Sequence, residues 1–322
     1  MFYDSTFHLN SFIGEQTIIN SKFTLQTPVM KHLILLLILS LSLNVFSNND
    51  TISSHWSLFN FKVKNKGKLY FYWGYNRGAY TNSDISFKGD GFDFTINNVK
   101  AHDRQTPFGW AAYFLPENLT IPQTNTKFGY FINDHLSINF GVDHMKYVTK
   151  QFQSLSITGE INTGGEYDRM YDKDEVEMTR EFLKFEHTDG LNYLNSEINY
   201  WHSLIAWKEK IILQGLGGAG AGFMMPKTNS TLLGLDRYDD FQIAGYGLNI
   251  KYGLNLRFCD YFFIQSEVKG GFIHMPNIQP TMRKSDKASQ HFFFGEYTLL
   301  FGFNVPLLKE KKKFQLTGTP SF

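Results

Sequence analysis

The residues best suited to chemistry in this sequence lie at positions 186–190, where Glu186, His187 and Asp189 occur close together. A histidine beside carboxylates has the composition of a general base, so these three are the candidate catalytic residues. No serine nucleophile can be paired with them from spacing alone, and Asp189 is followed by Gly190, a typical turn pair. We therefore favour the simpler interpretation, a turn that carries a solvated His187.

A glycine-rich segment at residues 215–220 has the spacing of a dinucleotide-binding fingerprint. That chemistry needs a helix directly after the glycines, with its N-terminus facing the pyrophosphate. Residues 223–226 end in Pro226 and show no helical period. We expect instead a strand whose glycines leave interior space or let a neighbour approach closely, and no cofactor.

The sequence offers no recognisable metal site. Cys259 is the single cysteine, which excludes an internal disulfide and a cysteine-based zinc site. Residues 166–181 are dense in acidic side chains but lack the spacing of a calcium loop. We expect this stretch to be a solvated outer loop, and we expect no bound metal.

Charged residues recur inside segments that alternate between apolar and polar positions. Residues 241–258 place Leu248 and Ile250 on one face and Asn249 and Lys251 on the other. This dyad repeat is typical of a transmembrane strand that is apolar toward lipid and polar toward the lumen. The same alternation predicts a near-neutral polar network in the lumen, formed by Asp143, Glu197, Lys251, Arg257, Glu267, Lys269 and Glu296.

The connections between these strands fall into two length classes. Short turns are expected at 133–135, 207–210 and 259–260, and long polar stretches at about 77–123, 150–188, 225–240 and 274–290. Outer-membrane barrels have short periplasmic turns and long outer loops. Parity then gives eight strands, near 68–76, 125–132, 136–148, 190–206, 210–224, 241–258, 261–273 and 290–305. Residues 92–96 are read as structure within the first outer loop, and ten strands remain the alternative.

The N-terminal region indicates export. Met30 and Lys31 precede an apolar run at 32–43, followed by small or apolar residues up to Ser47. This is the pattern of a secretory signal peptide, and the run is short for a transmembrane helix. We expect residues 1–29 to be an upstream extension from a mis-assigned start, 30–47 the signal peptide, 48–67 a periplasmic segment, 68–305 the barrel and 306–322 a basic periplasmic tail.

Composition agrees with an all-β chain, because it holds 32 Phe, 17 Tyr and 27 Gly, and its net charge of +1 gives no attraction to nucleic acid. The signal peptide, the amphipathic strands and the aromatic-rich final strand resemble the small bacterial outer-membrane β-barrels typified by the transmembrane domain of outer membrane protein A. The fold class we expect is therefore all-β, a transmembrane antiparallel up-and-down barrel.

The resemblance leaves the particular function open. An eight-stranded barrel is filled by its own side chains, so we expect a structural or surface-interaction protein with long outer loops and little conductance. Some barrels of this kind act on lipid A, which makes an enzyme using the His187 region the alternative. A transporter of small hydrophobic molecules through a lateral opening is a further alternative. The expected partners are outer-membrane lipid, lipopolysaccharide and the barrel-assembly machinery, with no nucleic acid and an unknown partner at the outer loops.

Overall fold

A computed structural model describes residues 56–58, 61–107, 109–115, 122–207, 210–235 and 240–307. The expected upstream extension and signal peptide lie outside the described residues, as do most of the expected basic tail and the first part of the segment 48–67. Those predictions therefore stay predictions.

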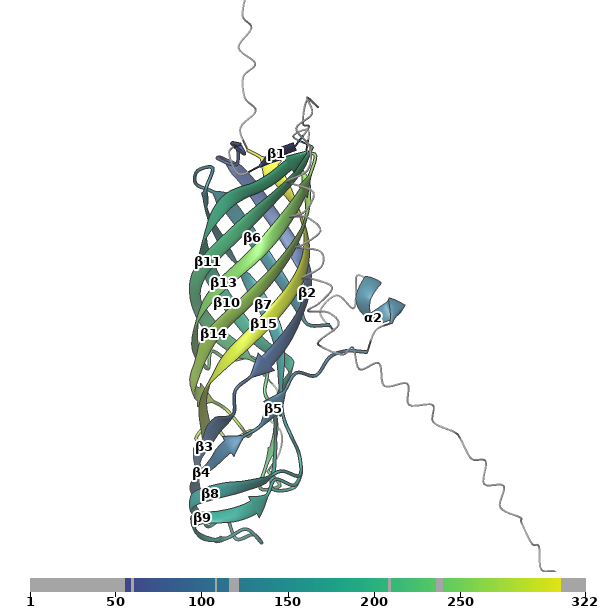
Figure 1. Ribbon diagram of the computed structural model, residues 1–322. Coiled ribbons are helices and arrows are strands. Elements are labelled where there is room, and N and C mark those ends of the chain that lie inside the picture. The colour runs from purple at the N-terminus through teal and green to yellow at the C-terminus, as the bar shows by residue number, and fades with distance from the viewer. Residues whose placement is uncertain are drawn as a thin grey trace, which may run out of the picture. The chain divides into compact units, whose positions relative to one another are not determined.

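Eight long antiparallel strands form a closed ring (Figure 1). Each strand is hydrogen-bonded to the next one around the ring, and the last strand pairs with the first. The ring consists of β2 (Lys68–Tyr80), β6 (Thr124–Phe131), β7 (Leu136–Thr149), β10 (Leu183–Trp207), β11 (Ile211–Pro226), β13 (Gly245–Phe258), β14 (Phe262–Ile278) and β15 (Lys287–Pro306). The predicted eight-stranded antiparallel barrel is confirmed.

Alternation along each strand sorts side chains between the two surfaces of the wall. In β13, Leu248 and Ile250 point outward and are 52% and 70% exposed, whereas Asn249 and Lys251 are buried inside. Because successive residues of a strand face opposite sides, a single register error would exchange these two sets. The register predicted from the sequence for this strand is the one that the structure shows.

The short connections β6–β7, β10–β11 and β13–β14 meet at one end of the ring, which we call the turn end. The opposite end, the loop end, carries four further strands, β3 (Ser83–Gly89), β4 (Phe92–Val99), β8 (Ser154–Ile161) and β9 (Arg169–Glu177). They continue the wall in the order β15-β3-β4-β8-β9, and we call them the extension (Figure 1). Two short strands complete this end, since β5 (Ala101–His102) pairs with β7 and β12 (Asn229–Leu232) pairs with β10.

The extension corrects the prediction of long polar loops. Residues 92–96 do lie within the first outer connection, as expected, but the first two connections form a sheet with a buried apolar side. The stretch expected to be a solvated loop at 166–181 includes β9, whose acidic side chains point mostly to solvent while Tyr171 is buried. A large apolar cluster fills the interior of the loop end, with members that include Ile85, Phe87, Phe94, Ile157 and Phe185.

The turn end is crossed by residues 61–67, which precede β2. Val63 packs against Ala206 and Ile212, and Asn65 is fully buried. The Asp134 carboxylate accepts hydrogen bonds from the backbone N–H groups of Asn65 and Lys66, both at 2.9 Å. This segment therefore covers the barrel mouth at the turn end, and β1 (Trp56–Leu58) adds a short pairing to the end of β10.

The described helix α2 (Trp110–Phe114) is five residues long. None of the helices in the described residues is long and apolar enough to cross a membrane.

Candidate functional site: the filled interior and the loop-end wall

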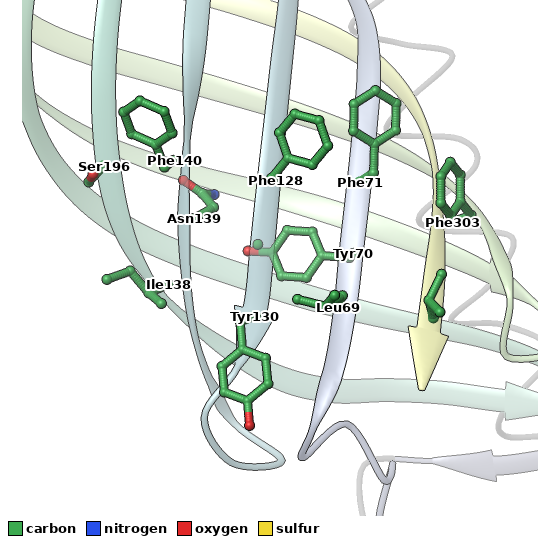
Figure 2. A pocket seen from close by; sticks show the side chains of 12 residues that line it. Leu69, Tyr70, Phe71, Phe128, Tyr130, Ile138, Asn139, Phe140, Ser196 and Phe303 are labelled. Carbon is green, nitrogen blue, oxygen red and sulfur yellow. The ribbon is translucent and has the colours of Figure 1, made fainter. Parts of the chain in front are cut away.

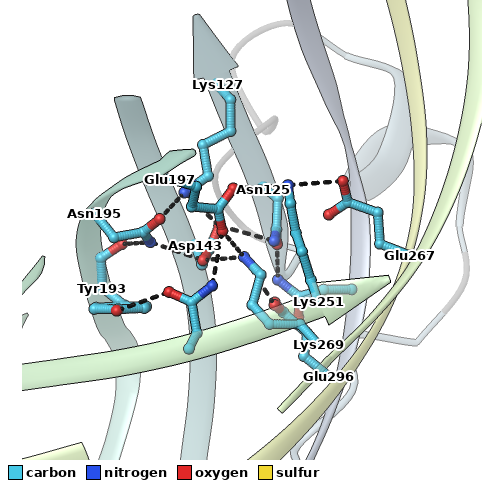
Figure 3. A network of polar contacts seen from close by, with 12 residues as sticks. Asn125, Lys127, Asp143, Tyr193, Asn195, Glu197, Lys251, Glu267, Lys269 and Glu296 are labelled. Carbon is cyan, nitrogen blue, oxygen red and sulfur yellow. Dashed lines mark hydrogen bonds and ion pairs between the residues drawn. The ribbon is translucent and has the colours of Figure 1, made fainter. Parts of the chain in front are cut away.

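An ionic network occupies the middle of the barrel, and Lys269 of β14 is its centre (Figure 3). The Lys269 ammonium lies 2.6 Å from Asp143, 2.9 Å from Glu197 and 3.7 Å from Glu296. All four side chains are fully buried. Charges removed from water in this way are tolerated only when partners surround them, so the contacts must form together.

Two further lysines belong to the network. Lys251 bridges Glu197 at 2.7 Å and Glu267 at 2.9 Å, and Lys127 lies 3.2 Å from Asp143. Figure 3 shows these side chains converging from separate strands around the ring. The network therefore joins strands far apart in sequence across the lumen.

Amide side chains occupy most of the remaining positions around the carboxylates. Asn125 and Asn195 donate to Asp143 at 2.9 and 2.8 Å, and Asn249 donates to Glu197 at 3.1 Å. Glu296 is the exception, because both of its carboxylate oxygens are buried and neither accepts a hydrogen bond within the described part of the chain. Glu296 therefore depends on its ion pair with Lys269 at 3.7 Å.

The structure gathers six of the seven predicted lumen residues into this network and places Arg257 elsewhere. Arg257 lies at the turn end, where its guanidinium donates to Gln214 at 2.7 Å and Asn65 at 2.8 Å and contacts Asp260 at 3.2 Å. Lys127 is a network member that the sequence reasoning missed. It sits between the outward-facing Thr126 and Phe128, so the same alternation could have identified it.

The glycine-rich segment lies in β11 and makes room for the network. A Cβ added at inward-facing Gly220 would lie 2.6 Å from Cγ of Glu197, and one at Gly222 would lie 2.0 Å from the backbone oxygen of Leu194. The expectation of a glycine-rich strand with a closely approaching neighbour is met, because larger side chains here would displace the acidic and amide groups of β10.

Apolar layers lie on both sides of the network. Toward the turn end, aromatic and aliphatic side chains pack inside the ring: Tyr70, Tyr72, Phe131, Trp201, Leu216, Phe263 and Leu300. Toward the loop end the interior passes into the apolar core of the extension. From the turn end to the loop end, the described interior therefore holds four layers. They are the crossing segment 61–67, an aromatic layer, the ionic network and an apolar core.

The candidate catalytic residues are not brought together. His187 is fully buried in the loop-end interior, where Nδ1 lies 3.1 Å from the Thr228 hydroxyl and Nε2 lies 3.2 Å from the Gln290 amide. Burial lowers the pKa of His187 to about 3, so its imidazole is neutral. The predicted solvated histidine was wrong, because a bulge in β10 between His187 and Leu191 changes which side chains face inward.

Glu186 and Asp189 lie apart from this imidazole. The Glu186 carboxylate pairs with Arg104 at 3.0 Å and Lys184 at 3.2 Å, while Asp189 lies in an exposed position of the bulge. Neither carboxylate therefore contacts the neutral imidazole of His187. The three residues lack the geometry of an oriented general base.

The outward surface of the ring carries an apolar groove of about 500 Å³ near the turn end (Figure 2). Its walls come mainly from β2, β6 and β7, and include Leu69, Phe71, Phe128, Tyr130, Ile138 and Phe140. Phe128 and Phe140 are 62% and 58% exposed, which is typical of a surface that contacts lipid rather than water.

A closed ring of eight antiparallel strands, apolar outside and filled with polar side chains inside, defines the class of small outer-membrane β-barrels. The chain has the fold of this class.

No family model and no curated protein matches the sequence. Among solved structures, the fold is similar to the outer membrane protein OprG from Pseudomonas aeruginosa, with a TM-score of 0.36 and 11% identity, over 77% of this chain and 99% of that one. It is also similar to Ail, the attachment invasion locus protein of Yersinia pestis, with a TM-score of 0.28 and 12% identity, over 74% and 99%. The N-terminal β-barrel domain of Pseudomonas aeruginosa OprF gives a TM-score of 0.26 and 9% identity, over 74% and 98%. These likenesses concern the fold alone.

Proposed function

We propose that this protein is a non-conducting barrel of the outer membrane that holds a rigid β-sheet extension outside the cell for surface interaction. The observation that carries the proposal is the continuity of the extension with the wall. β15 pairs with β2 inside the ring and with β3 in the extension, so a single strand belongs to both parts.

A filled interior supports the non-conducting role. The ionic network, the aromatic layer and the crossing segment 61–67 leave the lumen occupied by side chains along its length. In the proposed orientation, the turn end faces the periplasm and the loop end faces the exterior. Outer-membrane lipid contacts the outward apolar face, lipopolysaccharide surrounds the loop end, and the barrel-assembly machinery inserts the chain.

Planar-bilayer recordings of the purified protein test the first part of the proposal. We expect no steady single-channel currents, because a water-filled path would have to displace paired buried charges. Large and steady openings in the intact protein would overturn the non-conducting role.

Thiol labelling in whole cells tests the orientation, because the chain has one native cysteine. Cys259 is exposed at the turn end, so a membrane-impermeant maleimide should label it only after the outer membrane is permeabilised. In a Cys259→Ser background, Asp90→Cys at the exposed connection between β3 and β4 should be labelled in intact cells. The reverse pattern would contradict the orientation.

A further inference from the structure

A small cavity with an excess of positive charge lies on the loop-end wall between β7 and β10. It measures about 190 Å³ and is lined by Arg104, Val148, Thr149, Gln151, Arg180, Lys184 and Glu186. We call it the neck cavity. One water's share of liquid volume is about 30 Å³, so the space suits a group of several heavy atoms rather than a single ion.

Two of the three cationic side chains of the cavity are held by contacts with the Glu186 carboxylate. Glu186 is buried, and it holds Arg104 at 3.0 Å and Lys184 at 3.2 Å. Its Oε1 also accepts hydrogen bonds from Asn229 at 3.0 Å and Thr188 at 3.2 Å. The carboxylate therefore fixes two cations at the cavity wall while its own charge is compensated by them.

Arg180 supplies a third cation and has no counter-ion. It is exposed at the edge of the cavity and makes no hydrogen bond or ion pair within the described part of the chain. Three cations and one carboxylate line the cavity, so its net charge is +2. A planar guanidinium that is not otherwise engaged is well suited to bind two oxygens of one phosphate.

Gln151 adds a requirement that a simple anion does not meet. Its Nε2 donates to the backbone oxygen of Leu183 at 3.3 Å, whereas its buried Oε1 accepts no hydrogen bond. A buried acceptor of this kind is stabilised by a donor such as a hydroxyl. The lining is therefore complementary to a ligand that carries both anionic oxygens and a hydroxyl group.

The cavity also lies where such a ligand could be presented by a membrane lipid. Lipid-facing Ile138 and Phe140 and the cavity residue Val148 occupy even-numbered positions of β7, so they share the outward side of the strand. Glu186 is the register partner of Val148 on β10. The outward wall therefore leads from the apolar band, past Val142, His144 and Lys146, to the cationic lining.

We propose that the neck cavity binds a phosphorylated sugar. The source of that group can be a glycolipid headgroup in the outer leaflet or a soluble sugar phosphate. The lipid source rests on the proposed orientation in the membrane, whereas binding of the chemical group does not.

Calorimetric titration of the full-length protein in detergent tests the binding chemistry with glucose 6-phosphate, glucose and inorganic phosphate as probes. We expect glucose 6-phosphate to bind more tightly than inorganic phosphate, and glucose to show no binding. Arg180→Ala should weaken glucose 6-phosphate binding about tenfold through loss of a charge-assisted contact. Gln151→Leu should lower the affinity to that for inorganic phosphate.

Arg283→Ala is the matched control, since Arg283 is an exposed arginine elsewhere at the loop end. Equal affinities of Arg180→Ala and Arg283→Ala, or no binding of glucose 6-phosphate at all, would overturn the proposal. Inorganic phosphate that binds as tightly as glucose 6-phosphate would overturn the sugar assignment.

A second arm identifies the source. Protein reconstituted in vesicles with phosphorylated or dephosphorylated lipid A is titrated with glucose 6-phosphate. Competition by the phosphorylated lipid alone supports the glycolipid, and unchanged affinity in both vesicles supports the soluble ligand. Bilayer conductance and thiol labelling report on the proposed function separately, so its failure would be distinguishable from failure at the neck cavity.

Discussion

The Lys269 ammonium lies 2.6 Å from the Asp143 carboxylate, although the two residues are 126 positions apart in the chain. The contact spans the lumen from β14 to β7, two strands that are not neighbours in the ring. It therefore forms only when the intervening strands have their correct register. The interior network therefore depends on the register of several strands of the ring and not on one hairpin alone.

Removal of Lys269 should destabilise the barrel strongly. Lys269→Met leaves Asp143 and Glu197 with fewer counter-charges in a buried site, which costs about 3–5 kcal/mol for a broken buried pair. Urea unfolding in lipid vesicles, followed by tryptophan fluorescence, measures the change. Lys88→Met is the control, because the ion pair of Lys88 with Asp93 is exposed, and it should leave the midpoint unchanged. Equal midpoints for the two variants would contradict the role of the network.

Two glutamates of the same network should respond differently to neutralisation. Glu197→Gln breaks contacts with Lys251 and Lys269 at 2.7 and 2.9 Å and should cost about 3–5 kcal/mol. Glu296→Gln removes a buried carboxylate that accepts no hydrogen bond, so stability should be unchanged or increased. The two variants are compared by the same unfolding assay, and a larger loss for Glu296→Gln would show that its ion pair with Lys269 at 3.7 Å is the stronger contribution.

The inward glycines of β11 should not tolerate a side chain. In Gly222→Ala the new methyl group would meet the backbone of Leu194 and Asn195, which belongs to a paired strand and cannot swing aside. We expect a loss of about 1–3 kcal/mol from overpacking. Gly295→Ala has open space around its Cβ and should be neutral. The urea midpoints of the two variants decide the matter, and a neutral Gly222→Ala would show that the strands can separate there.

The extension should unfold without the barrel. Phe94 is 2% exposed and packs against Phe87 and Phe182, so Phe94→Ala should cost the extension about 3–5 kcal/mol. Trypsin should then cut faster within residues 83–180, while the barrel keeps its resistance to detergent before boiling. Met170→Ala, at a side chain 69% exposed, is the control. Loss of detergent resistance in Phe94→Ala would mean that the two parts fold as one unit.

His187 should make the loop end sensitive to acid. Burial lowers its pKa to about 3, against about 6.5 in an unfolded chain. Between these two pH values the unfolded state therefore binds more protons than the folded state. The stability contributed by the neutral imidazole is full above pH 6.5 and falls as the pH decreases toward 3. At pH 5 the loss is about 2 kcal/mol.

Hydrogen exchange of the loop-end backbone at pH 7.5 and 5.0 measures this effect after correction for intrinsic rates. His187→Gln retains hydrogen-bonding groups near Thr228 and Gln290 but does not titrate, so its protection should change less between the two pH values. An identical pH dependence in the variant and the native protein would assign the sensitivity to other groups.

Local alternation predicted the wall of the barrel and most of the charged groups inside it. Each strand of the ring shows a period of two, because one face meets lipid and the other meets a polar interior. Residues such as Glu197 and Lys251 could thus be placed inward from their own strand alone. Their partners could not, because contacts across the lumen depend on the relative stagger of strands that are distant in sequence.

The extension and the environment of His187 were harder to foresee for two physical reasons. The strands β3, β4 and β8 are short, and each has polar residues on its solvent side, so they resemble loop segments between longer strands. The inward position of His187 depends on an irregular register in β10, and sequence periodicity assumes a regular one. The single-strand pattern therefore fails where bulges and packing between connections decide the structure.

The shared strand β15 sets how far the molecule reaches from the membrane. Residues 294–306 of β15 pair with β2 in the lipid-facing ring, and residues 287–290 pair with β3 in the extension. A hinge at this point would also require breaking the pairing of β15 with β14, which spans it from Ala288 to Phe303. In the proposed orientation the extension therefore keeps a constant height above the lipid, and a binding partner would have to reach it at that height.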